Sequence, residues 1–327
     1  MNTNELHPVY LCDISYEVGE ICDVNDIKND GETHESIELL KERGISNYSK
    51  LSDKLEDIIL EQVITTLSKS NVKAEDIDGV MVVTESFSEI FDGTATRGDT
   101  VFRTMRNKLF ASFSKIGIQK KVFLSSTFGG SGNFLNAMFI GFPLIQTGKL
   151  TNLLVVCADQ NPNGVSRYME EALAVAGDGV AVCLLTNAPR CSSTFQKIEY
   201  VGISPFSTSD EWESLGEAVL EMYRSTKFAA ADCYEQTSRQ PGEFDWLVMN
   251  NYNDTTMDIF SKLLGFSKDR TFSSNISRTG HIPACDILVN LKDLSKSSPG
   301  MKAGSKTMVY VNSPYACGAI SLIHPAK

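Results

Sequence analysis

Two side chains of the sequence lie where a turn leads into an apolar helical run, and their types suit catalysis. Ser131 lies in GGSGN, and His281 lies in TGHIPACD. Backbone N–H groups at the first turn of a helix can stabilise an oxyanion. The positive end of a helix also lowers the pKa of a histidine, which keeps it a neutral base. A serine nucleophile with a histidine base is one interpretation of this pair.

Both residues also have a structural interpretation. A serine at the start of a helix is very often an N-cap, whose hydroxyl accepts a backbone N–H. An isolated internal histidine is more often a structural residue than a catalytic one. The pattern of residues leaves these alternatives open for Ser131 and His281.

Three further polar residues are expected near the same site. Asp286 follows His281 by about one helical turn, so it could orient the imidazole or balance its charge. It could equally be a solvated helix residue. Asn250 and Asn253 end the strand-like segment VMNNYND, and asparagine amides are donors for a carbonyl oxygen. The phosphate-binding patterns GxxxxGK[ST] and GxGxxG are absent, as is the GxSxG elbow of hydrolases.

Two segments of the chain share one plan of strand, small polar turn and apolar helix. VFLSSTFGGSGNFLNAM begins at Val122, and RTFSSNISRTGHIPACDIL begins at Arg270. This weak internal repeat predicts two related halves, 1–190 with the serine turn and 191–327 with the GH and NNYN motifs. Their turns would meet at the carboxyl ends of strands, where open α/β sheets place their chemistry. Two unrelated helix starts are the alternative.

Apolar runs of strand length alternate with helical patterns, which predicts an α/β fold. Helices are expected over 53–68, 101–116, 215–236 and 256–264, the first with a capping box of Asp53 and Glu56. Strands are expected at VMVV, VFLSS, TNLLVVCAD, GVAVCLLTN, EFDWLVMNN, FSSN, TMVYVN and GAISLI. Continuous apolar strands of this kind are covered on both faces.

Composition limits the classes of function. The 327 residues are 42% hydrophobic and carry a formal net charge of −11, which argues against nucleic acid or anionic lipid as the main partner. No leader or membrane-spanning run is visible, so a soluble, cytoplasmic protein is expected. Eight cysteines without a CxxC pair make a metal site unexpected, and Cys157 and Cys183 are expected to be buried.

The order of the motifs resembles the ketoacyl-ACP synthase III branch of the thiolase superfamily over nearly the whole chain. The segments that carry the resemblance are KERGISNY, AEDIDGVMVVTES, GGSGNFLNAM, QTGKLTNLLVVCAD, VAGDGVAVCLL, DWLVMNNYN and SRTGHIPACDIL. The resemblance implies a thiolase fold, with two pseudo-repeated βαβ-rich halves in a five-layered αβαβα arrangement. It also implies a homodimer, or a heterodimer with a related synthase, that pairs through VFLSS and LLVVCA.

The catalytic residues of that family are replaced here. Its nucleophilic cysteine falls on Ser131, its histidine on Asn250 and its asparagine on His281. The tryptophan and arginine that hold the adenine of CoA fall on Glu38 and Glu42. Decarboxylative condensation uses two neutral donors, whereas acyl transfer to oxygen or nitrogen needs a base for the acceptor. His281 could be that base.

The resemblance therefore implies an acyltransferase of secondary metabolism. Ser131 would carry the acyl group, His281 would be the base, Asp286 or Asn250 would orient it, and backbone N–H groups at Gly130 and Gly318 would form the oxyanion hole. The donor would be an acyl carrier protein or CoA thioester and the acceptor a small molecule, with no other cofactor. The candidate carrier-binding residues, which could equally form a solvated helix face, are Arg103, Arg106, Lys120 and Lys121. The alternatives are a carbon–carbon condensing ketosynthase and a non-catalytic partner subunit.

Overall fold

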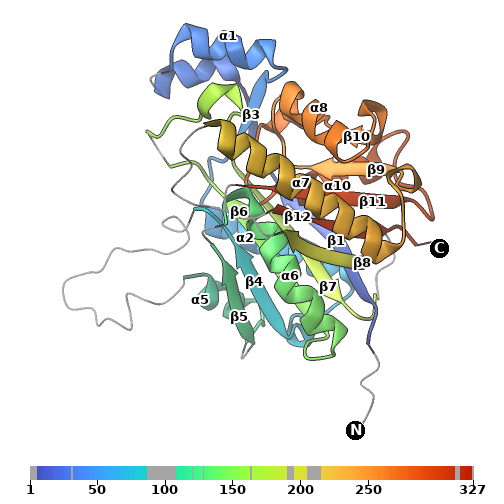
Figure 1. Cartoon of the computed structure of the whole chain (residues 1–327). Helices are drawn as coiled ribbons and strands as arrows, with labels where there is room; N and C mark the ends of the chain where they lie inside the picture. Colours follow the sequence, from blue (N-terminus) through green and yellow to red (C-terminus); the bar gives the residue numbers. More distant parts are fainter. Residues whose placement is uncertain are drawn as a thin grey trace.

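A mixed sheet of ten strands runs through the molecule (Figure 1). The computed structural model describes residues 6–30, 32–86, 108–119, 121–127, 129–162, 164–189, 195–204, 215–313 and 317–325. The strand order is β10-β9-β11-β12-β8-β1-β7-β6-β4-β5. The strands are β1 (Val9–Glu17), β4 (Gly79–Val83), β5 (Val122–Ser126), β6 (Asn152–Asp159), β7 (Gly179–Thr186), β8 (Phe195–Ser204), β9 (Trp246–Met249), β10 (Thr271–Phe272), β11 (Lys306–Asn312) and β12 (Cys317–Ile323). A separate hairpin pairs β2 (Glu20–Asp23) with β3 (Asn47–Lys50).

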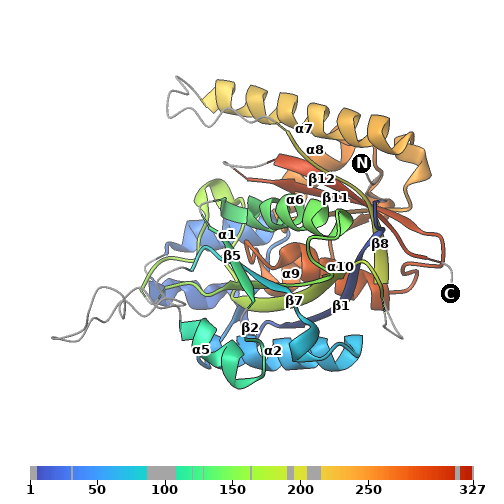
Figure 2. The ribbon, with the colours of Figure 1, turned by 90° about the horizontal axis from the view of Figure 1, so that it is seen from below.

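The helices lie in three layers around this sheet (Figure 2). Helices α2 (Leu55–Ser70) and α5 (Lys108–Lys115) cover the outer face of the part that runs from β1 to β5. Helices α7 (Leu215–Thr237) and α8 (Asp254–Leu263) cover the part from β8 to β10. Helices α6 (Asn133–Gln146) and α10 (Asp286–Lys296) pack between the two parts. This arrangement confirms the predicted five-layered α/β fold.

Local sequence explains most of these elements. Every residue of β6 and β7 is buried, as expected for apolar runs covered on both faces. Cys157 and Cys183 lie in these strands and are buried as predicted. Because β6 pairs with β4 and β7 on its two sides, LLVVCA cannot lie in a subunit interface, and that expectation is wrong. Strand β5 stands at the edge of the sheet among the described strands.

The central strands β1 and β8 were not predicted. Strand β1 carries a register shift between Cys12 and Ser15, with Asp13 in the left-handed region at φ 50°. This irregularity buries polar Asp13 and Ser15 and breaks the alternation by which a strand is identified. The start of α2 also differs from the prediction. Its N-cap is Lys54, without a side-chain cap, so the capping box at Asp53 is wrong.

The remaining predictions concern the helix expected over 101–116, the boundary near residue 190 and the expected absence of a membrane-spanning helix. Residues 101–107 of the expected 101–116 helix lie outside the described residues, and α5 forms its second part. Residues 190–194 also lie outside them, so the boundary near residue 190 stays a prediction. Among the described residues, no helix is both long enough and apolar enough to span a bilayer.

Candidate active site

Ser131 lies in the turn between β5 and α6. The turn holds Gly130 at φ 54°, a conformation that glycine adopts without strain. A short 3-10 helix over Gly130–Gly132 contains Ser131, and the N-cap of α6 is Gly132, without a side-chain cap. Ser131 is therefore not a helix cap. Ser131 is 6% exposed, and its hydroxyl points at two oxygens, the hydroxyl of Tyr252 and the carbonyl of Asn312, each 3.2 Å away.

His281 lies in the second turn, after the short helix α9 (Ile276–Thr279). Gly280 takes φ 66° there, with its Cα against the backbone of Val175. The His281 N–H donates to the Val175 carbonyl, and the His281 carbonyl accepts from Gly177. These backbone bonds fix the imidazole inside the protein, where it is 2% exposed.

Asp286 orients the imidazole of His281. The His281 Nδ1 lies 2.5 Å from Asp286 Oδ2, so the carboxylate accepts the Nδ1 proton. Asp286 also accepts the N–H groups of Asn251 and Ile282, both at 2.8 Å, and the Asn251 amide at 3.1 Å. This geometry leaves Nε2 as the ring nitrogen that can take a proton from a ligand.

The other asparagines have different roles. Asn253 caps α8 by accepting the Thr256 N–H and donates to the Ala172 carbonyl, so it does not offer donors to the site, contrary to the prediction. Asn250 is 1% exposed, and neither amide atom has a hydrogen-bond partner within the described chain. Met249 lies opposite Tyr310, which brings the end of β9 beside Asn312 at the end of β11.

Tyr252 is a site residue that sequence reasoning missed. It lies in the same VMNNYND segment, two residues after Asn250, and is buried. Its hydroxyl donates to the Asn312 carbonyl at 2.6 Å, and its ring centroid lies 5.3 Å from that of His281. Burial raises the pKa of Tyr252, which keeps the phenol protonated. Ser131 and His281 thus both contact Tyr252, and no direct hydrogen bond joins the two in the described structure.

Two acidic residues at strand ends were also missed. Asp159, at the end of β6, accepts the N–H groups of Ala284 at 2.6 Å and Glu85 at 2.7 Å, and burial raises its pKa to about 7. The Glu85 carboxylate accepts the N–H groups of Gly129 and Gly130, and burial raises its pKa. These bonds join the serine turn to the histidine turn. Acids at the end of strand β6 and two residues beyond the end of the parallel strand β4 were the signal available in the sequence.

Gly130 and Gly318, the two glycines predicted as oxyanion-hole donors, lie in different elements, one in the serine turn and one in a strand. The N–H of Gly130 donates to Glu85. Gly318 lies within β12, opposite Val311 of β11 and Ile203 of β8, where backbone groups pair with neighbouring strands. Their role in an oxyanion hole stays a prediction.

Of the predicted donor-binding residues, Lys121 and Glu38 have described contacts, and these are not part of this network. Arg103, Arg106 and Lys120 lie outside the described residues, and Lys121 donates to the Glu75 carbonyl at 2.7 Å. Glu38 lies on helix α1 (His34–Glu42), 2.9 Å from Lys41.

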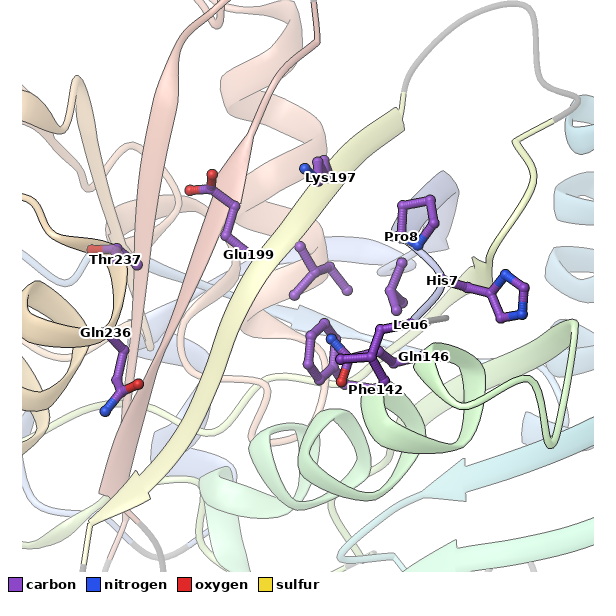
Figure 3. Close-up of a pocket in the computed structure, with 11 residues that line it drawn as sticks. Leu6, His7, Pro8, Phe142, Gln146, Lys197, Glu199, Gln236 and Thr237 are labelled. Atoms are coloured by element: carbon purple, nitrogen blue, oxygen red, sulfur yellow. The ribbon is translucent and has the colours of Figure 1, made fainter. Parts of the chain in front are cut away.

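A cavity of about 470 Å³ lies at the other end of α6 (Figure 3). Its lining includes His7, Gln146, Lys197 and Gln236. Gln146 ends α6, whereas Ser131 precedes its start, and a helix of 14 residues is about 21 Å long. This cavity is therefore separate from the Ser131 turn.

Comparison with known proteins identifies the fold. No family model matches the chain. A β-ketoacyl-[acyl-carrier-protein] synthase III of Streptococcus gordonii is 23% identical over 272 residues, 78% of each chain, and one of Microcystis aeruginosa is 23% identical over 294 residues, 80% of this chain and 81% of its own. Among solved structures, ChlB3, which is called an acyltransferase, matches with a TM-score of 0.79 at 14% identity, over 98% of both chains. The synthase III of Aquifex aeolicus matches with a TM-score of 0.74 at 15% identity, over 97% of this chain and 100% of its own.

Sequence identity to the proteins named above is low, at 14–23%. Sequence similarity extends over more than three quarters of the chain, and the structural match extends over nearly all of it. The chain therefore has the fold of the ketoacyl synthase III-like proteins, a thiolase fold, and is similar to them in sequence at 23% identity.

Proposed function

We propose that this protein is an acyltransferase that moves an acyl group from a thioester to a hydroxyl or amine acceptor. The observation that carries the proposal is the buried His281–Asp286 pair, with its 2.5 Å contact at Nδ1. A histidine held in this way presents a neutral Nε2, which can remove a proton from an incoming nucleophile. Transfer to oxygen or nitrogen needs such a base.

The buried amide of Asn250 also supports the proposal, because it could bind the acyl donor. A buried amide without partners costs about 1–3 kcal/mol, because its atoms lose their bonds to water. A ligand carbonyl that accepts from the Asn250 amide would offset this cost. We propose the carbonyl of the acyl thioester as that ligand.

The proposed donor is an acyl carrier protein, and the proposed acceptor is a small molecule. Two curated relatives carry the name of an acyl-carrier-protein synthase. Glu38 and Glu42 would repel the phosphates of CoA, whereas a carrier protein brings only a phosphopantetheine arm. We therefore expect the acidic helix α1 to disfavour CoA.

One observation favours a second candidate, a non-catalytic partner of a related synthase. Ser131 contacts a phenol and a backbone carbonyl, and neither is a base. A subunit that only supports a catalytic partner would tolerate such a site. Stable co-purification with a cysteine-containing relative, together with no transfer by the purified chain, would favour this candidate.

The experiment that tests acyl transfer compares wild type with His281→Asn. Acetyl- and octanoyl-loaded carrier proteins serve as donors, with benzyl alcohol and benzylamine as acceptors. Loss of the base should slow transfer by about 10²–10⁴-fold. His34→Asn is the matched control, because His34 is exposed on α1 and should leave the rate unchanged. An unchanged rate per folded molecule in His281→Asn, with a lowered melting temperature, would remove His281 from the mechanism.

A further inference from the structure

Tyr252 lies between the two residues whose types best fit acyl chemistry. Its hydroxyl is 2.6 Å from the Asn312 carbonyl oxygen and 3.2 Å from the Ser131 hydroxyl. The Ser131 hydroxyl is itself 3.2 Å from the same Asn312 oxygen. The rings of Tyr252 and His281 are tilted by 39°, with 5.3 Å between their centroids. Tyr252 therefore contacts both residues, whereas no direct hydrogen bond joins Ser131 to His281 in the described structure.

The protons in this cluster can be assigned from the contacts. The short contact places the Tyr252 proton on the line to the Asn312 carbonyl, which can only accept. The Ser131 proton then points to that carbonyl, to the phenol oxygen, or to a ligand. A phenol that keeps its proton and a backbone carbonyl are both too weakly basic to remove it. A serine without an adjacent base is a weak nucleophile, but its hydroxyl remains a good hydrogen-bond donor.

We propose that the acyl group passes from the thioester to the acceptor in one step, with Ser131 as a hydrogen-bond donor and Tyr252 as the residue that positions it. This inference rests on the proposed acyl transfer and specifies its course. The acceptor oxygen or nitrogen attacks the thioester carbonyl while His281 Nε2 takes its proton. The carbon–sulfur bond then breaks, and the departing thiolate receives that proton from His281. Ser131 donates to the carbonyl oxygen as negative charge develops on it.

The hydrogen bond from Ser131 to the Asn312 carbonyl shows that the Ser131 hydroxyl is placed to donate to a carbonyl oxygen. The Asn312 oxygen is a carbonyl oxygen that already lies within reach of both hydroxyls. Ser131 can turn its O–H toward a second carbonyl by rotation about one bond, without movement of the backbone. Tyr252 stays anchored to Asn312 and holds the Ser131 oxygen in place. The hydroxyl of Tyr252 thus acts on the reaction through Ser131.

Intact-protein mass and initial rates test the single step. Wild type is mixed with acetyl-loaded carrier protein without an acceptor, the reaction is quenched, and the mass of the intact protein is measured by mass spectrometry. We expect no acetyl group on Ser131, and we expect intersecting initial-rate lines when carrier thioester and benzyl alcohol are both varied. Ser131→Cys is the detection control, because cysteine is nucleophilic without a strong base. A stoichiometric acetyl adduct that Ser131→Ala removes, or parallel rate lines, would overturn the inference while leaving the acyltransferase proposal intact.

A double-mutant cycle tests the role of Tyr252. Ser131→Ala should lower the maximal rate by about 10²–10³-fold, the usual effect of removing one donor to an oxyanion. Tyr252→Phe keeps the ring and removes the hydroxyl, and it should slow transfer by roughly tenfold with an unchanged KM for the donor. Because Tyr252 acts through Ser131, the double variant should be no slower than Ser131→Ala alone. Additive losses would assign Tyr252 a structural role only and overturn its positioning role. Absence of transfer by wild type to either acceptor, with any donor, would instead count against the proposed function and would remove the basis of this inference.

Discussion

His281 Nδ1 and Asp286 Oδ2 lie 2.5 Å apart, and both side chains are almost completely excluded from solvent. The two residues are separated by five positions, across the start of α10. Asn251 and Ile282 donate three further hydrogen bonds to the same carboxylate. A carboxylate with four donors is held rigidly, so the imidazole that it binds is fixed in one orientation.

Replacement of Asp286 by asparagine should weaken both stability and transfer. An amide cannot accept all four hydrogen bonds, because one of its two heteroatoms is a donor. We expect the free energy of unfolding to fall by roughly 1.5–3 kcal/mol, measured by urea titration. Transfer per folded molecule should also slow. Asp258→Asn is the control, because Asp258 pairs with Lys262 on the surface of α8, where such pairs contribute little. Equal stability of both variants would contradict this prediction.

Burial of Asp159 should make stability depend on pH. The pKa of Asp159 is raised to about 7 from 3.8, first by burial and then by the nearby charge of Glu85, against the opposing hydrogen bonds of two backbone N–H groups. Below pH 3.8 both the folded and the unfolded states are protonated. Between pH 3.8 and 7 the unfolded state loses this proton first, so the free energy of unfolding falls as pH rises.

The Asp159→Asn variant should lose this pH dependence of the free energy of unfolding. Its free energy of unfolding, relative to wild type, should rise by about 1–3 kcal/mol between pH 5 and pH 8. Urea titrations at the two pH values measure the difference, with Asp258→Asn as surface control. The same pH dependence in wild type and Asp159→Asn would show that Asp159 is not the group responsible.

The exposed edge of β5 predicts a dimer. Val122 is 48% exposed at this edge, and Phe110 of α5 is 49% exposed with its ring 4.7 Å from that of Phe123. Unpaired backbone groups and apolar side chains at a strand edge favour pairing with a second chain. Light scattering at micromolar concentration should give a homodimer, or a heterodimer when a related synthase is present. Val122→Glu should weaken the dimer, and Ile259→Glu on α8, at a site 50% exposed, should not. A monomeric wild type would contradict the prediction.

The acidic residues of α1 should influence the choice of acyl donor. With Glu38 and Glu42 present, kcat/KM should be higher for an acyl carrier thioester than for the matching CoA thioester. Replacement of both by glutamine should raise kcat/KM for CoA, because charge repulsion is reduced. Replacement of Glu61, exposed on α2, serves as the control. Equal values for the two donors with wild type would count against a carrier-bound donor.

The sequence by itself determined most of the element types and the order of the motifs, although strands β1 and β8 were not predicted. Apolar runs such as those of β6 and β7 specify buried strands through local composition, and periodic patterns specify the helices. It also placed Ser131 and His281 at turns beside helix starts, because small polar and glycine residues there interrupt the apolar pattern. The resemblance to ketoacyl synthase III came from seven such local segments in order.

The tertiary structure decided which side chains meet. Tyr252 contacts Ser131 across 121 positions, and Asp159 accepts a hydrogen bond from Ala284 across 125 positions. Asn251, and not Asn253, holds Asp286, because the chain turns at the end of β9 and aims neighbouring side chains in different directions. Side-chain direction at such a bend depends on the packing of several elements, and no local pattern encodes it. The sequence therefore identified the two turns that carry Ser131 and His281, and only the folded chain brought Tyr252 into contact with both residues.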